Sequence, residues 1–495
     1  MPGVLMIYHS HDNSTLTMDL SLLWHDTLAI APISLLTLVA LVVLTVEALN
    51  DRTEHLNAWI SVFGLAGSFG LSLASIGSPA TTVFHNMATM GGYASFFAAL
   101  FSFAGLLTVM LSKHYIKKEG IEHSEYYSVV LFAVIGMMLM AAAADLVILF
   151  LGLETMSIAF YILAGFARRR LISNEAAMKY FLLGAFATGF FLYGVALLYG
   201  SSGTTNIPLL VRQAATLASS PLFLIGCGLL LIGFTFKVAA VPFHMWVPDV
   251  YEGAPTTVSG FMSTGGKAAA FAGVVLVFAP ALMLTVAPLR EIMAAIAALS
   301  MIVGNVIAIS QSSIKRMLAY SSIAHAGYIL AGVIAANTYG LQGVLFYLVA
   351  YTMMNVGAFG VIAFLESAEG QNLTFDDCSG LAARYPMLAL IMSVFMFSLS
   401  GVPPFAGFFG KYYVFAGAVQ AGYTWLAIVG VLMSVVSAYY YLRLVVLMYF
   451  KEESAVSLEA SRSRLGVAAL LVSVAALLGF GIFPSVVLDV IPRFF

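Results

Sequence analysis

The sequence predicts an all-α polytopic membrane protein of about fourteen transmembrane helices, with two inverted five-helix repeats whose seventh and twelfth helices are broken. Three observations support this prediction: the composition, two copies of one short motif, and prolines inside two long apolar runs. Of the 495 residues, 61% are hydrophobic and 9% are charged, whereas ordinary soluble domains have roughly 25% charged residues. We therefore expect the chain to lie in a lipid bilayer.

Fourteen apolar windows of suitable length follow one another along the chain. A transmembrane helix needs about 20 mainly apolar residues, and polar, glycine or proline residues separate the windows. The first 26 residues contain no Lys or Arg and do not have the pattern of a signal peptide, so the first span is the expected targeting element. We expect spans at residues 27–48, 58–78, 91–112, 126–144, 145–166, 176–199, 221–246, 256–284, 290–310, 318–336, 340–365, 386–420, 424–449 and 466–488.

The 21 Lys and Arg residues indicate how these spans are oriented. With both termini on the outer side, only Arg212, Arg290 and Arg493 fall on that side, and three lysines stay within the membrane. Inner loops and helix ends then hold Arg52, Lys113, Lys117, Lys118, Arg168, Arg169, Arg170, Lys179, Lys315, Arg316, Arg384, Arg443, Lys451, Arg462 and Arg464. Because loops on the inner side of a membrane are enriched in basic residues, this asymmetry favours outer, periplasmic termini.

One short motif occurs twice. The stretches LETMSIAFYILAG (153–165) and YSSIAHAGYILAG (320–332) lie in the fifth and tenth expected spans. An offset of five helices inserts the second copy upside down, which is the inverted-repeat arrangement common in transporters. We therefore divide the chain into helices 1–3 (1–125), a first repeat (126–284), a second repeat (285–450) and a C-terminal loop and helix (451–495).

Prolines support the same repeat independently. Pro242 lies in AVPFHMW of the seventh span, and Pro403 and Pro404 lie in GVPPFAGFFGK of the twelfth. A proline inside a helix removes a hydrogen-bond donor and clashes with the preceding turn. Both spans should therefore be broken near the middle of the membrane, and broken helices at matching positions of two repeats point to an ion pathway.

Four ionisable residues are expected within the membrane: Glu154, Lys237, Lys267 and Lys411. Each costs about 2.5–3.5 kcal/mol at a helix centre, so they should be buried against polar partners and not face lipid. A buried lysine gives up its proton more readily, and a nearby carboxylate opposes this. Movement of Glu154 relative to Lys237 would then switch the lysine between holding and releasing a proton.

The proposed relay continues from Lys267 through His325 to Lys411 along a hydrated line, with His244 as a further candidate just after the first break. Each of these residues also has a simpler interpretation. Glu154 and Lys237 could form a structural ion pair, the Lys411 side chain could extend to the membrane surface, and His325 could be a packed polar residue. Asp145 is interpreted as an interface residue, and PDVYEGAP (248–255) as a loop-shaping segment.

Other functional classes find little support. A net charge of −2 offers no basic patch for nucleic acid. Cys227 and Cys378 are the only cysteines and form no metal-binding pair, so neither an iron–sulfur cluster nor another metal is expected on this chain. No pair of histidines on facing helices suggests a haem site.

Several stretches resemble the antiporter-like membrane subunits of respiratory complex I. They are DLVILFLGLETMSIAFYILAGF from 145, SNEAAMKYFLLGA from 173, FKVAAVPFHMWVPDVYEGAPTTVSGFMSTGGKAAAF from 236, SSIKRMLAYSSIAHAGYILAG from 312 and GVPPFAGFFGKYYVF from 401. The resemblance covers both repeats, and PDVYEGAP is its most specific block. The region before about residue 120 adds only hydrophobicity.

The resemblance implies fourteen helices, with repeats over spans 4–8 and 9–13, and proton translocation driven by quinone reduction elsewhere in the complex. The family's carboxylate of the fifth helix falls on Glu154. Its lysines of the seventh, eighth and twelfth helices fall on Lys237, Lys267 and Lys411. The family often places a polar residue at the position of His325. NAD, FMN, iron–sulfur clusters and quinone are expected on partner subunits, and the chain is expected in a bacterial inner membrane beside other subunits of the complex.

Two other functions remain open from the sequence. The chain could be a subunit of an Mrp-type Na⁺/H⁺ antiporter, which would exchange ions without redox partners. It could also be a scaffold with a vestigial repeat, in which case single lysine substitutions would disturb assembly more than proton flux. The electron donor, the quinone type and the number of protons moved are not visible in the sequence.

Overall fold

The computed structural model describes residues 26–50, 53–278, 280–366, 372–454, 458, 460–461 and 463–494. Within these residues, twelve continuous helical segments are long and apolar enough to cross a membrane. They are α2 (Ala31–Leu49), α3 (Glu54–Ser75), α4 (Gly92–Lys118), α5 (Glu125–Ala142), α6 (Leu146–Ala164), α7 (Leu171–Ser202), α11–η1–α12 (Thr256–Val277), α14 (Ala287–Ile309), α15 (Ile314–Ala335), α16 (Thr338–Leu365), α20 (Thr424–Phe450) and α21 (Arg464–Ile482).

Two interrupted spans bring the total to the predicted fourteen. The first consists of α9 (Pro221–Lys237) and α10 (Trp246–Gly253), and the second of α18 (Pro386–Ser400) and α19 (Ala406–Gln420). Both breaks fall at the predicted prolines. The first broken span continues to Gly253, beyond its predicted window, because α10 resumes after the break.

At the first break, side chains form hydrogen bonds with backbone groups that a continuous helix would have paired. The Val241 N–H donates to Ser300 Oγ at 2.9 Å, and Trp246 Nε1 donates to the Phe236 carbonyl at 3.1 Å. Side chains therefore replace the lost helical hydrogen bonds, as irregular backbone at membrane depth requires.

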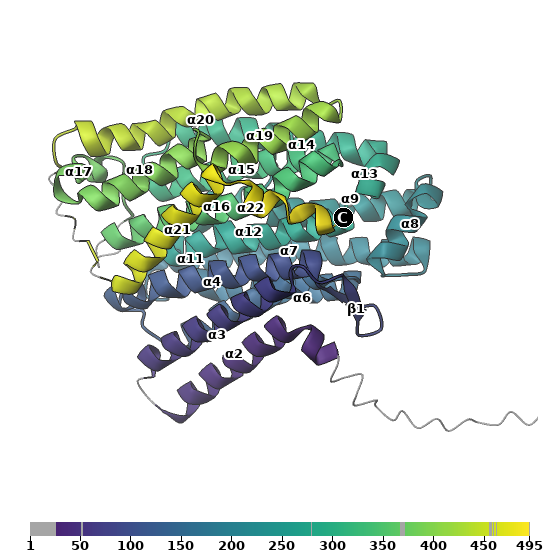
Figure 1. The fold of residues 1–495 in the computed structure, drawn as a ribbon, viewed down its shortest axis with the longest axis horizontal. Coiled ribbons are helices and arrows are strands. Elements are labelled where there is room, and N and C mark those ends of the chain that lie inside the picture. The colour runs from purple at the N-terminus through teal and green to yellow at the C-terminus, as the bar shows by residue number, and fades with distance from the viewer. Residues whose placement is uncertain are drawn as a thin grey trace, which may run out of the picture.

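The helices run side by side across the molecule, with α2 and α3 along one edge and α20 along the opposite edge (Figure 1). The most deeply buried segments are α15, α16 and α11–η1–α12. In contrast, α2, α3, α7, α20 and α21 expose apolar side chains on one face, which suits contact with lipid or with neighbouring subunits. The buried centre therefore contains the helices that carry Lys267 and His325.

Close helix contacts occur at nearly matching places in the two repeats, displaced by one residue in the motif alignment. A Cβ atom on Gly136 of α5 would lie 2.5 Å from the Met156 backbone nitrogen of α6. A Cβ on Gly304 of α14 would lie 2.6 Å from the Ala324 backbone nitrogen of α15. Small residues that let helix backbones touch are typical of membrane-helix packing. Spans 4 and 5 thus pack in the same manner as spans 9 and 10.

Several short elements were not predicted from the sequence. A hairpin of β1 (Thr81–Val83) and β2 (Ala88–Met90) precedes α4, and the amphipathic helix α8 (Ile207–Leu217) precedes α9. The remaining short elements are α13 (Pro280–Thr285), η2 (Asp376–Cys378), α17 (Leu381–Arg384), α22 (Ser485–Leu488) and η3 (Ile491–Phe494). The hairpin, α8, α13 and the C-terminal end lie at one end of the bundle, and α17 lies at the other (Figure 1).

The predicted division into four segments stays a prediction. Arg52 and Arg462, which the orientation argument counted on the inner side, lie outside the described residues. The Arg493 side chain, which the orientation argument counted on the outer side, also lies outside what the structure describes.

Candidate functional site

Lys237 is the last residue of α9, directly before the first break. Its side chain is buried, and Nζ donates to Ser157 Oγ at 2.6 Å. Nζ also lies 3.4 Å from the Tyr161 hydroxyl and 5.6 Å from the centre of that ring. Both partners belong to α6, one turn apart, so α6 holds the amine of the broken helix through hydroxyl groups.

Glu154 lies three residues before Ser157 on α6, and its carboxylate is half-buried. Its Oε1 accepts a hydrogen bond from Thr188 Oγ1 of α7 at 2.7 Å. Both Glu154 and Lys237 are fully described, and no ion pair joins them within 4.0 Å. A direct structural ion pair is therefore not the role of these two residues, although both belong to the same neighbourhood of α6.

Lys267 directly follows a π-helical turn, η1 (Met262–Gly266), inside the eighth span. Its side chain is buried, and Nζ donates to the Ser322 carbonyl at 2.6 Å and to the hydroxyl of the same residue. The ring of Tyr351 lies 5.8 Å from Nζ. The second repeat, through α15, thus supplies the partner of a lysine that belongs to the first repeat.

His325 lies one turn beyond Ser322 on α15 and is 1% exposed. Its Nδ1 lies 2.7 Å from the Tyr347 hydroxyl, and its Nε2 lies 3.1 Å from the Tyr441 hydroxyl. Each hydroxyl can either donate or accept, so both tautomers of a neutral histidine fit this arrangement. Such a group can take a proton at one nitrogen and release one at the other.

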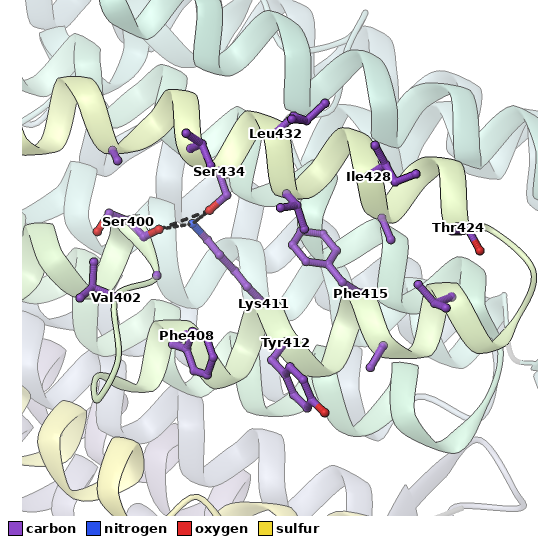
Figure 2. Close-up of a pocket in the computed structure, with 17 residues that line it drawn as sticks. Ser400, Val402, Phe408, Lys411, Tyr412, Phe415, Thr424, Ile428, Leu432 and Ser434 are labelled. Atoms are coloured by element: carbon purple, nitrogen blue, oxygen red, sulfur yellow. Dashed lines mark hydrogen bonds between the residues drawn. The ribbon is translucent and has the colours of Figure 1, made fainter.

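Lys411 extends from α19 to the C-terminal end of α18 (Figure 2). Its Nζ donates to the carbonyls of Leu399 (3.0 Å) and Ser400 (2.9 Å) and to Ser434 Oγ of α20 (2.7 Å). The carbonyl groups at a helix C-terminus carry partial negative charge and favour a cation. Since the amine is buried and has three acceptors, extension of Lys411 to the membrane surface is excluded.

A groove of about 730 Å³ lies over Lys411 between α19 and α20 (Figure 2). Apart from Lys411, Ser400 and Ser434, most of its lining is apolar and includes Phe408 and Phe415. Lys411 thus lines a groove at the side of the bundle, and its amine stays hydrogen-bonded to carbonyls at the end of α18.

The structure does not connect His244 to the other candidates. The residue lies in the segment between α9 and α10 and is half-buried, and its Nδ1 has no hydrogen-bond partner among the described residues. Asp145 is the N-cap of α6, accepting from Val147 N (2.8 Å) and Thr205 Oγ1 (2.7 Å), in agreement with its smaller predicted role.

PDVYEGAP ties the two repeats together. Arg316 of α15 contacts Asp249 (3.0 Å) and Glu252 (2.7 Å) of α10 through Nη1. Lys179 of α7 contacts the other oxygen of Asp249 at 2.7 Å. The segment therefore does more than shape a loop, because it links helices of both copies by ion pairs.

Sequence reasoning missed the hydroxyl groups around the lysines and the histidine. Tyr161 and Tyr328 occur at the same position of the repeated motif, which was the one available signal for them. Among the described residues, no group of three His, Cys, Asp or Glu side chains has the geometry of a metal site. The chemistry this arrangement supports is proton transfer among amines, an imidazole and hydroxyls.

Three buried lysines on three spans, two of them on interrupted helices of a repeated bundle, define an ion-translocating membrane protein of the antiporter type. The family model for NADH:quinone oxidoreductase/Mrp antiporter transmembrane proteins matches residues 143–437. NADH-quinone oxidoreductase subunit N of Trichlorobacter lovleyi is 48% identical over 466 residues, which cover 93% of this chain and 95% of the relative. The chain belongs to the family of NADH-quinone oxidoreductase subunit N.

A solved structure agrees with this assignment. A chain of respiratory complex I from Thermus thermophilus with bound aureothin is 35% identical, with a TM-score of 0.80, over 92% of this chain and 98% of that chain. A chain of the Mrp complex from Dietzia sp. has a TM-score of 0.83 over 94% of this chain and 97% of its own length, at 19% identity. The second likeness shows a shared fold alone.

Proposed function

We propose that this chain is the proton-translocating N subunit of a bacterial NADH:quinone oxidoreductase and moves protons through Glu154, Lys237, Lys267, His325 and Lys411. The observation that carries the proposal is the burial of three lysine amines whose partners are hydroxyls and carbonyls instead of carboxylates. An amine held only by such dipoles can lose its proton without leaving a carboxylate buried and unpaired. Membership of the family supports the same function.

In this proposal, Glu154 acts on Lys237 through its charge. A negative Glu154 favours the protonated lysine, and neutralisation or displacement of the carboxylate favours proton release. Ser157 holds the amine in place during both states, because its hydroxyl donates to the Leu153 carbonyl and can accept an N–H from either an ammonium or a neutral amine. Thr188 fixes the carboxylate from α7.

The second half of the relay runs from Lys267 to Lys411. Ser322 binds the Lys267 amine, and His325 follows one turn later on the same helix. The ring of Tyr328 lies between His325 (5.5 Å between ring centres) and the Lys411 amine (5.1 Å from the ring centre). A proton crosses this aromatic interval with the help of water, since no direct hydrogen bond joins the two side chains among those described.

We also propose a membrane location and partner subunits for this chain. The chain lies in the inner membrane with both termini on the periplasmic side, in accordance with the distribution of Lys and Arg. It assembles with the other membrane subunits of the complex. NADH, FMN, iron–sulfur clusters and quinone are bound by partner subunits, and their redox chemistry drives the relay.

The test is proton pumping by membrane vesicles whose complex carries Lys237→Ala, with NADH as electron donor and assembly checked on a native gel. We expect an assembled complex with pumping lost and NADH oxidation depressed. Lys451→Ala is the matched control, because Lys451 is exposed and its removal leaves the buried groups intact. Normal pumping by Lys237→Ala would contradict the relay, and failed assembly with normal flux in the remaining complex would favour a scaffold.

The second candidate is a subunit of an Mrp-type antiporter, favoured by the shared fold of the Dietzia chain. This alternative predicts exchange of Na⁺ for H⁺ in vesicles that contain no redox partner subunits. We expect no such exchange, and proton movement only during oxidation of NADH by the whole complex.

A further inference from the structure

A second group of charged residues, buried except for a partly exposed Arg170, lies outside the relay, at the end of the bundle where most Lys and Arg residues gather. Its members come from four elements: Glu119 directly after α4, Arg170 before α7, Lys315 near the start of α15, and Glu366 directly after α16. We call these residues the Glu119–Glu366 cluster. None of the functions assigned above uses it.

Glu366 is 4% exposed and only partly bonded. Its Oε2 accepts from Thr256 Oγ1 at 2.6 Å and from the Tyr115 hydroxyl at 3.3 Å. Its Oε1 has no hydrogen-bond partner among the described residues. Lys315 Nζ lies 3.9 Å from this oxygen, beyond hydrogen-bonding distance, and donates instead to the Ala254 carbonyl at 2.9 Å.

Glu119 has the same property. Its side chain is 2% exposed, and Oε2 pairs with Arg170 Nη2 at 2.5 Å. Its Oε1 is buried and has no hydrogen-bond partner among the described residues. Burial raises the pKa of Glu119, the Arg170 charge lowers it, and the charge of Glu366 raises it again, with a net shift upward. Lys118 and Lys315 add weaker attraction for the carboxylate.

Two carboxylate oxygens of this cluster have no hydrogen-bond partner among the described residues. This indicates a bound proton or a bridging water at the cluster. Buried polar atoms in proteins are almost always hydrogen-bonded, and unpaired ones mark bound water or a functional role. The charge of Glu366 also raises the pKa of Glu119, because like charges oppose ionisation. The cluster therefore has the chemistry of a proton-holding site.

Polar side chains of α16 occur near Lys267, and Glu366 follows the end of the helix, whereas residues 356–365 between them are apolar. The Tyr351 hydroxyl and both amide atoms of Asn355 are buried and form no hydrogen bond of good geometry with any described residue. Asn355 and Glu366 are about three helical turns apart, so they lie on nearly the same face of the helix. The Tyr351 ring contacts the Lys267 amine. Unpaired polar atoms thus occur at both ends of this apolar stretch.

The helix opposite α16 supplies hydroxyl groups. The α11–η1 segment packs against α16 and leads directly to Lys267. Its first residue, Thr256, bonds Glu366, and four further buried hydroxyls follow before the lysine. They belong to Thr257, which lies 3.3 Å from the Tyr126 hydroxyl of α5, and to Ser259, Ser263 and Thr264, which donate to the backbone carbonyls of Tyr251 and Gly260. The ring of Phe359 lies against Gly260, within the apolar stretch of α16 between Asn355 and Glu366.

We propose that the Glu119–Glu366 cluster takes up protons from the side of the membrane where Lys and Arg residues gather and delivers them to Lys267 along the α11–η1 segment, past Phe359. This inference rests on the proposed relay, which supplies the acceptor. The proton that arrives on Glu366 passes through bound water to the Lys267 amine, and Glu119 takes up the next one. Phe359 interrupts the water between transfers.

The experiment compares Glu366→Gln and Glu119→Gln in the whole complex in vesicles, with NADH as donor. Glutamine keeps the size and an acceptor oxygen, so Thr256, Tyr115 and Arg170 retain a partner while the proton site is lost. We expect an assembled complex whose pumping falls about a hundredfold, the lower end of the range for a positioned acid or base. Glu366→Asp should restore part of the rate. Glu125→Gln is the control, since Glu125 is exposed at the same end of the bundle.

A second readout separates proton uptake from a structural role. Infrared difference spectra of reduced and oxidised complex should contain a protonated-carboxyl band that disappears in Glu366→Gln or Glu119→Gln and is unchanged in Glu125→Gln. A structural clamp predicts no such band. Loss of assembly in both glutamine variants, without rescue by Glu366→Asp, would also overturn the inference.

Lys267→Ala distinguishes failure of the uptake site from failure of the relay. If Lys267→Ala abolishes pumping and both glutamine variants pump normally, the uptake site is wrong and the relay stands. If Lys267→Ala and Lys237→Ala also pump normally, the relay itself fails.

Discussion

Tyr161 and Tyr328 occupy the same position in the two repeats, and the ring of each faces a lysine amine from a broken span. Lys237 Nζ lies 5.6 Å from the Tyr161 ring centre, and Lys411 Nζ lies 5.1 Å from the Tyr328 ring centre. Lys237 precedes its break, whereas Lys411 follows its own. The two repeats therefore reach the same lysine–tyrosine arrangement from opposite halves of a broken helix.

The first prediction concerns these rings. Tyr328→Leu should weaken the hold on the Lys411 amine by about 2 kcal/mol, because a buried cation–π contact is lost. Pumping should fall roughly thirtyfold if that energy appears in the rate-limiting barrier. Tyr328→Phe keeps the ring and should retain most activity, despite losing the hydrogen bond from Asn305. Equal pumping by the Leu and Phe variants, measured with a pH-sensitive dye in vesicles, would show that the ring is unimportant.

The second prediction uses a matched pair of glycines. Gly401 (φ 87°) and Gly422 (φ 86°) both have left-handed backbone conformations, so alanine should cost about 1–2 kcal/mol of strain at either position. Only at Gly401 would the new Cβ meet Lys411, at 2.9 Å from its Cδ. Gly401→Ala should therefore lower pumping about tenfold or more by displacing the amine.

Gly422→Ala is the control, because its Cβ would meet nothing within 4 Å. Both variants should lose similar stability in a thermal denaturation of the purified complex. A similar loss of pumping in both variants would mean that backbone strain, and not the position of Lys411, causes the defect.

The third prediction tests the contact between spans 4 and 5. Gly136→Ala places a methyl group against the backbone of α6, and such overpacking costs about 1–3 kcal/mol. We expect a lower melting temperature of the complex or a smaller assembled fraction on a native gel. Gly189→Ala on α7 is the control, because its Cβ would meet nothing within 4 Å. Equal melting temperatures for both variants would argue against close backbone packing at Gly136.

The fourth prediction is a pH dependence. Burial of Glu119 raises its pKa above the ordinary value of 4.5, so the folded chain binds this proton more tightly than the unfolded chain. Stability must then decrease as pH rises from 4.5 to the raised pKa and change no further above it. Glu119→Gln removes this loss.

The corresponding measurement is the melting temperature of the purified complex over a series of pH values. The difference between Glu119→Gln and wild type should become more favourable to the variant as pH rises above 4.5. Glu125→Gln is the control for removal of an exposed glutamate at the same end of the bundle. A constant difference across the series would mean that Glu119 has the same proton affinity in both states.

The spans and their breaks could be predicted from the sequence for physical reasons. Pro242 and Pro404 cannot continue a helix, and the intramembrane lysines stand out because charge is costly in lipid. The helix α8 was missed although Asn206 caps it and Pro208 lies in its first turn, since a short amphipathic run between polar loops resembles an irregular connection. The hairpin of β1 and β2 is too short to give a clear alternating pattern.

The partners of the buried groups were less accessible from the sequence. Serine is frequent in membrane spans, and nothing local distinguishes Ser157 or Ser322 from the others, because their role depends on which helices meet. The expected proximity of Glu154 to Lys237 proved indirect, with Ser157 as the hydrogen-bond partner of the amine. The roles of His244 and His325 in proton transfer stay predictions, though His325 has the hydrogen bonds that such a role requires.

The π-helical turn before Lys267 has an evolutionary consequence. A π turn amounts to one extra residue in an α-helix, so its loss would rotate everything that follows by about 100°. The Lys267 amine would then point away from Ser322 while Thr256 stayed beside Glu366. Natural insertions and deletions should thus be absent between Thr256 and Lys267 in relatives that keep both residues, even where loops vary freely in length. An alignment that counts this interval across the family would reveal such a constraint without any biochemical assay.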